Sequence, residues 1–175
     1  MGPRDDAVGL LVELGAEDVD HLGSDLLTHL LGTERILLSW RAPHPIVLAG
    51  LCHAAYGTAG FPLSLLDLAD RPRLADVIGA EAEAAVYLYC SCTRDGWQQQ
   101  LRQPVVTFED RFTGERFPLD PAGLRSLALI TAANELDLTR RGVFDDATRT
   151  SIAGLIDDLA PYAPSIAAAA AEVRP

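Results

Sequence analysis

The sequence predicts an all-α fold that carries one small β-hairpin. Apolar residues recur at helical spacing through most of the 175 residues, whereas strand-like alternation occurs only on the two sides of Thr113-Gly114. The stretch 46–56 is apolar almost all round, which is typical of a central helix. A chain of this length with 49% hydrophobic residues can bury a full core. We therefore expect a single helical domain over residues 1–175.

The N-terminal part is predicted to form helices that lead into the central one. A helix is expected over 5–14, where Gly15 ends it, and a second over 16–31, with Gly32 as a break or a bend. The segment 33–40 adds another turn or two. Two prolines predict a loop over 41–45, and Pro45 is placed to begin the central helix 46–56, which 57–62 ends.

The remaining sequence is predicted to be helical apart from the hairpin. Shorter helical segments are expected over 63–68, 74–78 and 81–90. Strands over 105–112 and 115–119 form a hairpin insertion over about 104–119. Asp120-Pro121 opens a long helix to about Arg140, and an aspartate at 145 or 146 caps another to about 160. The alanine-rich segment 165–173 is helical by propensity.

Charge and composition exclude several classes of protein. The chain has 14 basic residues, all arginine, against 25 acidic ones, which gives a net charge of −11. Such a balance argues against binding to nucleic acid or to anionic membranes, because both need clusters of positive charge. The sequence shows neither a transmembrane stretch nor a signal-peptide apolar region. Three cysteines in no zinc-binding spacing favour reduced, buried thiols, so we expect a cytoplasmic protein.

The histidines carry the candidate chemistry. His21, Asp25 and His29 follow one another at steps of four residues, so they would share one face of the expected helix 16–31. His53 lies on the expected central helix, where a polar ring needs a partner. If the two helices pack together, His29 and His53 meet in one buried place. A core histidine bonded to a backbone carbonyl is the structural alternative for each of them.

Two segments around these histidines resemble the HD-domain superfamily. Residues 28–34, Thr-His-Leu-Leu-Gly-Thr-Glu, are followed 24 residues after His29 by an apolar run that ends in His53-Ala54. The segment 53–58, His-Ala-Ala-Tyr-Gly-Thr, is similar to an HSxYGT-type motif of uncharacterised bacterial proteins. The resemblance implies an HD-like helical bundle, and a later metal-binding position on the long helix that matches Asn134 here. The superfamily has aspartate where this chain has Ala54 and Asn134, which argues against a dinuclear centre.

The resemblance implies a single divalent metal ion (Mn, Fe or Zn) held by His29, His53 and Asn134. Asp25 would orient a ligating histidine, and His21 is a further ligand or a catalytic residue. Glu135 and Asp137 are candidates for the missing acid, although we expect both to lie off the face of Asn134. Arg35, Arg71 and Arg73 are candidates to bind a phosphate group.

Three functions remain open at this point. The first is a metal-dependent hydrolase that acts on a small acidic or phosphorylated molecule. The second is a metal-free lyase, isomerase or cyclase, in which a His–Asp pair is the base and Tyr56 or Thr58 donates to developing negative charge. The third is a non-catalytic ligand-binding or regulatory module that has lost the metal site. A homodimer formed through helices is a further expectation.

Overall fold

The computed structural model describes residues 2–175, so Met1, the first residue of the predicted domain, lies outside the described part. Most of the described residues are helical, which confirms the all-α prediction. The helices are α1 Pro3–Glu13, α2 Leu26–Ser39, α3 His44–Leu51, α4 Arg71–Ile78, α5 Ala80–Ser91, α6 Trp97–Leu101, α7 Pro121–Arg140, α8 Asp146–Leu159 and α9 Ala167–Val173, with single 3₁₀ turns η1 Leu68–Asp70 and η2 Pro164–Ile166. The strands are β1 Asp20–His21, β2 Ser24–Asp25, β3 Thr107–Glu109 and β4 Arg116–Pro118.

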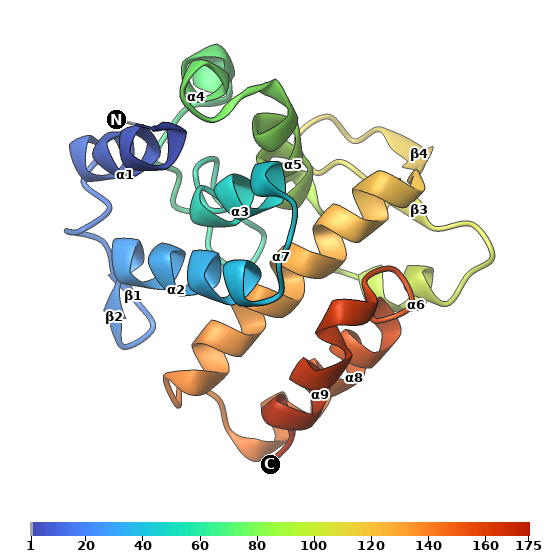
Figure 1. Ribbon diagram of the computed structural model, residues 1–175. Coiled ribbons are helices and arrows are strands. Elements are labelled where there is room, and N and C mark those ends of the chain that lie inside the picture. The colour runs from blue at the N-terminus through green and yellow to red at the C-terminus, as the bar shows by residue number, and fades with distance from the viewer. Residues whose placement is uncertain (1) are drawn as a thin grey trace.

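The long helix α7 crosses the middle of the molecule, with α2 and α3 on one side and α8 and α9 on the other (Figure 1). It begins where the sequence predicts, because the Asp120 side chain accepts a hydrogen bond from the Gly123 amide at 2.7 Å. Helix α3 packs against α1, α2, α4, α5 and α7, as expected for an apolar central helix. The site described below lies where α2, α3 and α7 meet.

The prediction of one helix over 16–31 is wrong. Strands β1 and β2 pair as a second small hairpin, in which His21 faces Ser24. The two residues between them, Leu22 and Gly23, have φ values of 36° and 85°, and two positive φ values in a two-residue turn are typical of type I′. Helix α2 starts only at Leu26 and then runs through Gly32, so of the two alternatives expected there, a break or a bend, the break is absent.

The central helix is shorter than predicted. It ends at Leu51, and the chain continues through turns over 52–56, so His53 lies beyond the helix rather than on it. The segment 63–67 is irregular, and the only helical geometry near it is the 3₁₀ turn η1.

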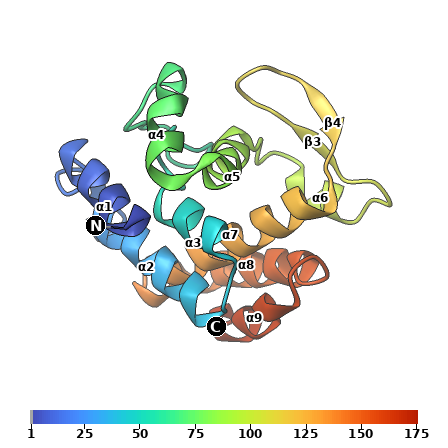
Figure 2. The ribbon, with the colours of Figure 1, turned by 45° about the horizontal axis from the view of Figure 1, so that its top comes forward.

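The predicted hairpin of 104–119 is present with shorter strands. Strands β3 and β4 pair antiparallel, with Phe108 opposite Phe117. In Figure 2 the hairpin projects from the helical body beside α5 and α6. Phe108 is buried against Trp97, whereas Phe117 is exposed, so only one side of the hairpin joins the core.

One connected cluster of buried apolar side chains extends from Ala7 in α1 to Val173 in α9. Cys52, Cys90 and Cys92 are free thiols buried within it, and Cys90 Sγ donates to the carbonyl oxygen of His53 at 3.1 Å. Among residues 2–175, no helix has both the length and the apolar character needed to cross a bilayer.

Candidate functional site

The structure brings His29 and His53 together. Their Nε2 atoms lie 3.3 Å apart, and the two side chains, from α2 and from the turn after α3, are almost completely buried. On its other side, His53 Nδ1 lies 2.7 Å from the carbonyl oxygen of Gly50. Because a carbonyl oxygen only accepts, His53 Nδ1 carries the hydrogen.

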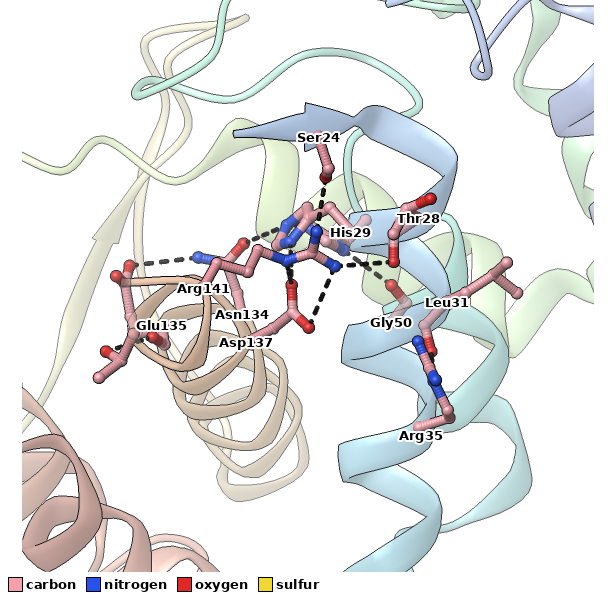
Figure 3. A network of polar contacts seen from close by, with 12 residues as sticks. Ser24, Thr28, His29, Leu31, Arg35, Gly50, Asn134, Glu135, Asp137 and Arg141 are labelled. Atoms are coloured by element: carbon pink, nitrogen blue, oxygen red, sulfur yellow. Dashed lines mark hydrogen bonds and ion pairs between the residues drawn. The ribbon is translucent and has the colours of Figure 1, made fainter. Parts of the chain in front are cut away.

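Helix α7 completes the cluster with two residues three positions apart. Asn134 Oδ1 lies 3.0 Å from His29 Nε2, and Asp137 Oδ2 lies 2.8 Å from His29 Nδ1 (Figure 3). The expectation that Asp137 lies off the face of Asn134 is wrong, since residues at i and i+3 are neighbours on a helix surface. Asp137, and not Asp25, is therefore the carboxylate that orients a histidine.

Arg141 holds Asp137 in place from one turn further along the chain. Its Nε donates to Asp137 Oδ2 at 2.6 Å, and its other nitrogens reach Ser24 Oγ and the carbonyl oxygen of Thr28. Burial alone would raise the pKa of the Asp137 carboxyl, but the hydrogen bonds from His29 and Arg141 outweigh it and lower that pKa. Asp137 is thus an ionised acceptor, and His29 Nδ1 carries a hydrogen.

Gly32 makes the approach of Asp137 to α2 possible. A Cβ atom at Gly32 would lie 1.9 Å from Asp137 Oδ1 and 2.6 Å from Asp137 Cγ. No side chain fits there while the carboxylate keeps its place.

The hydrogen positions leave two acceptor atoms turned toward His29 Nε2. Burial, with a contribution from His29, lowers the pKa of His53 from 6.5 to about 3, so at neutral pH this ring is neutral and its Nε2 has no hydrogen. Asn134 Nδ2 donates to Glu135 at 3.2 Å, which turns Oδ1 toward His29. A positive charge, either a proton on His29 Nε2 or a metal ion, is then needed between these atoms.

His21 reaches the cluster from the β1–β2 hairpin rather than from a helix face shared with His29. Its ring centroid lies 4.6 Å from those of His29 and Phe61. The side chain is 7% exposed, and neither ring nitrogen has a hydrogen-bond partner within residues 2–175. Burial, together with the charges of His29 and Arg141, lowers the pKa of His21 to about 4.

The cluster opens into a cavity of about 240 Å³. Its lining combines the histidines and Asn134 with other polar and apolar residues: His21, Leu22, His29, His53, Ala54, Thr58, Gly60, Phe61, Tyr89, Arg94, Asn134, Glu135, Leu138 and Phe144. Thr58 is part of this wall, and its Oγ1 accepts a hydrogen bond from the Phe61 amide at 3.0 Å. Of the predicted site residues, His21, His29, His53, Thr58 and Asn134 therefore share one cavity.

Two predicted site residues lie elsewhere. Asp25 is the N-cap of α2: its carboxylate accepts from the Thr28 amide and hydroxyl at 2.7 and 2.6 Å, and these bonds lower its pKa. Tyr56 is buried in another part of the core, where its hydroxyl donates to Glu83 at 3.0 Å. Neither residue lines the cavity.

The candidate phosphate-binding arginines are also absent from the lining. Arg71 pairs with Glu83, Arg73 pairs with Glu13, and Arg35 donates to a carbonyl oxygen of its own helix. The arginine in the wall is Arg94, which no sequence pattern singled out.

Within residues 2–175, no three His, Cys, Asp or Glu side chains gather as a metal-binding group. The cluster offers two imidazole nitrogens, and its third converging atom is the amide oxygen of Asn134.

Comparison with known proteins gives one partial match. No curated protein and no solved structure matches the chain. Residues 10–94, just under half of the chain, match the model of a family described as a domain of unknown function (DUF6817). The match includes His21, His29, His53, Thr58 and Arg94, and it stops short of α7, which supplies Asn134 and Asp137.

Proposed function

We propose that this chain is an enzyme that hydrolyses a small molecule in the histidine-lined cavity and that it uses one divalent metal ion. The observation that carries the proposal is the convergence of three atoms: His29 Nε2 lies 3.3 Å from His53 Nε2 and 3.0 Å from Asn134 Oδ1. Atoms that present lone pairs to one another in a buried place repel unless a proton or a metal ion lies between them.

The donor set fits a transition metal. Histidines that bind metals usually donate their second N–H to a carboxylate or a backbone carbonyl, as His29 and His53 do here. Imidazole suits zinc and iron, an amide oxygen is acceptable to manganese as well, and three protein ligands leave a position open for catalysis. His29, His53 and Asn134 would hold the ion, which when bound supplies Lewis-acid polarisation of the bond to be cleaved.

The surrounding residues have separate tasks in this proposal. Asp137, fixed by Arg141, holds His29 in one tautomer with Nε2 turned inward. His21, with a pKa of about 4, is neutral at pH 7, and neither of its ring nitrogens has a partner within residues 2–175, so it can accept a proton from the substrate for a short time as a weak base. Thr58 keeps its hydroxyl hydrogen, because Oγ1 only accepts from the Phe61 amide, so it can donate to developing negative charge. Hydrolysis as the reaction class rests on the resemblance to the HD-domain superfamily.

A specific observation also supports a second candidate, a metal-free lyase, isomerase or cyclase. The 3.3 Å between the two Nε2 atoms is also compatible with a long N–H···N hydrogen bond. A proton on His29 Nε2 would make an imidazolium paired with Asp137, and this imidazolium would be the general acid. Chelators would then leave turnover unchanged, whereas His29→Ala or His53→Ala would abolish it.

Element analysis of protein purified without a chelator tests the metal. We expect about one equivalent of Mn, Fe or Zn per chain, because the cluster offers a single set of converging ligands. His29→Gln and His53→Gln should each lose it. His44→Gln is the matched control, since His44 is exposed at the start of α3 and should leave the metal content unchanged.

Hydrolysis is measured on a panel of p-nitrophenyl esters and phosphates, before and after chelation and metal replacement. Protein that has no metal and recovers none on addition of Mn, Fe or Zn would contradict the metal-dependent proposal. Turnover that survives chelation but is lost in His29→Gln would favour the metal-free enzyme. Bound metal with no turnover of any substrate would favour the non-catalytic module.

A further inference from the structure

The lining of the cavity contains one permanent positive charge. Arg94 lies there beside Tyr89, with Phe61 and Phe144 among the apolar residues of the same lining. Arg94 is the only arginine of the cavity lining in the described part of the chain. Arg94 also lines a second cavity, with Trp97 and Gln98, so its side chain lies between the two.

The guanidinium of Arg94 differs from those of the partly buried Arg71 and Arg141, each of which pairs with a carboxylate. Within residues 2–175 it forms no ion pair within 4.0 Å, and its Nε is buried without an acceptor, while the Tyr89 hydroxyl and the Glu135 carboxyl group act on its charge from nearby. Its Cζ lies 5.0 Å from the centre of the Tyr89 ring. Arg41 and Arg125 also lack polar partners among the described residues, but both are exposed to solvent. A partly buried guanidinium with free donors is costly unless a ligand supplies the acceptor.

The charge of the lining selects among anions. A guanidinium matches the two oxygens of a carboxylate or a phosphate equally well in geometry. The one carboxylic acid among the described lining residues is Glu135, whose charge attracts Arg94 although the two form no ion pair within 4.0 Å. A cavity lining with one cation and one acid suits a ligand with a single negative charge better than a phosphate monoester, which carries two.

We propose that Arg94 binds the carboxylate of a small, monoanionic organic acid, whose apolar body packs against Phe61 and Phe144. The Tyr89 ring contacts the His53 ring edge-on and also lies under Arg94, so an acid held there extends toward the histidine cluster. The volume of about 240 Å³ is roughly that of eight water molecules, which suits a molecule about the size of benzoate. This inference names the substrate class of the enzyme proposed above and rests on that function.

Benzoate, its neutral counterpart benzamide and the dianion phenyl phosphate are the probes. Binding is measured by calorimetry on the protein as purified, on Arg94→Met and Arg94→Lys, and on Arg125→Met as the exposed control. We expect benzoate to bind at least tenfold more tightly than benzamide. Arg94→Met should weaken benzoate at least tenfold and leave benzamide unchanged, Arg94→Lys should weaken it less, and Arg125→Met should have no effect. In wild-type protein, benzoate should shift the Arg94 Nε–H resonance, a measurement that does not depend on a variant folding.

Three results would overturn the proposal: no binding of benzoate by the wild type, benzoate affinity that is equal in Arg94→Met, or tighter Arg94-dependent binding of phenyl phosphate. Failure of the carboxylate site is distinguishable from failure of the metal proposal. Arg94→Met should keep its metal content, whereas His29→Gln should lose the metal. Benzoate that is lost in His29→Gln but kept in Arg94→Met is bound by the metal and counts against Arg94.

Discussion

Replacing Gly32 with alanine should break the contact that orients His29. The new Cβ would lie 1.9 Å from Asp137 Oδ1, and an ordinary contact begins at 3.4 Å, so the carboxylate must move by about 1.5 Å. A hydrogen bond of 2.8 Å from His29 does not survive such a displacement. Losing a buried hydrogen bond to a charged group costs about 1.5–3 kcal/mol. Alanine regains about 1 kcal/mol of helix propensity over glycine, so we expect a net loss of about 0.5–2 kcal/mol in the free energy of unfolding.

Urea unfolding of Gly32→Ala and of a matched helical control measures this effect. Gly9 lies in α1 with nothing within 4 Å of its added Cβ, so Gly9→Ala should stabilise the protein by up to about 1 kcal/mol. In an Asp137→Ala background the clash is removed, and Gly32→Ala should then be neutral or stabilising. Metal affinity should fall about 10–100-fold in Gly32→Ala, because Asp137 no longer orients the ligand.

Two outcomes would refute this reasoning. One is a Gly32→Ala protein that is as stable as the Gly9→Ala control and has an unchanged His29 Nδ1–H resonance. The other is the same destabilisation in the presence and in the absence of the Asp137 carboxylate, which would place the clash elsewhere.

Three further predictions separate structural from functional residues. Asp25→Ala removes only a helix cap, so it should lower the free energy of unfolding by about 1 kcal/mol in urea titrations and leave metal content unchanged. Tyr56→Phe should lower the free energy of unfolding by about 1 kcal/mol, because the hydrogen bond to Glu83 is lost, and should leave turnover unchanged. A fall in turnover would show that Tyr56 acts in the site. In chelated protein, the low pKa values of His21 (about 4) and His53 (about 3) mean that below pH 6.5 the unfolded chain takes up protons first. The free energy of unfolding should therefore fall by about 1.5 kcal/mol per histidine between pH 6.5 and 5, and His21→Phe should remove its share.

Local signals in the sequence predict most of the elements correctly. Asp120-Pro121 and Asp145 are strong helix starts, and the structure places N-caps at both aspartates. The helix expected over 16–31 fails because apolar periodicity was followed across a turn. Gly23 and the Asp25–Thr28 capping pair were the signals that the helix begins later.

The site could be predicted only in part, because its contacts join distant segments. The pairing of His29 with His53 was expected on the condition that their two helices pack together, and the family resemblance then pointed to the same pair. Asp137 was within reach of the sequence, since a helix places residues 134 and 137 on one face. Arg94 was not, because it follows α5 in a segment with no periodic pattern, and only the fold brings it to the cavity.

The buried thiols can be used to measure local opening of this protein. Burial raises the pKa of Cys52 and Cys90 to about 12 and that of Cys92 to about 11, so at neutral pH hardly any thiolate is available to an alkylating reagent. Each alkylated thiol therefore reports a local opening of the packing around α3 and α5. Because Cys90 Sγ donates to the backbone carbonyl oxygen of His53, the rate at which Cys90 is alkylated reports how often the packing around His53 opens in otherwise native protein.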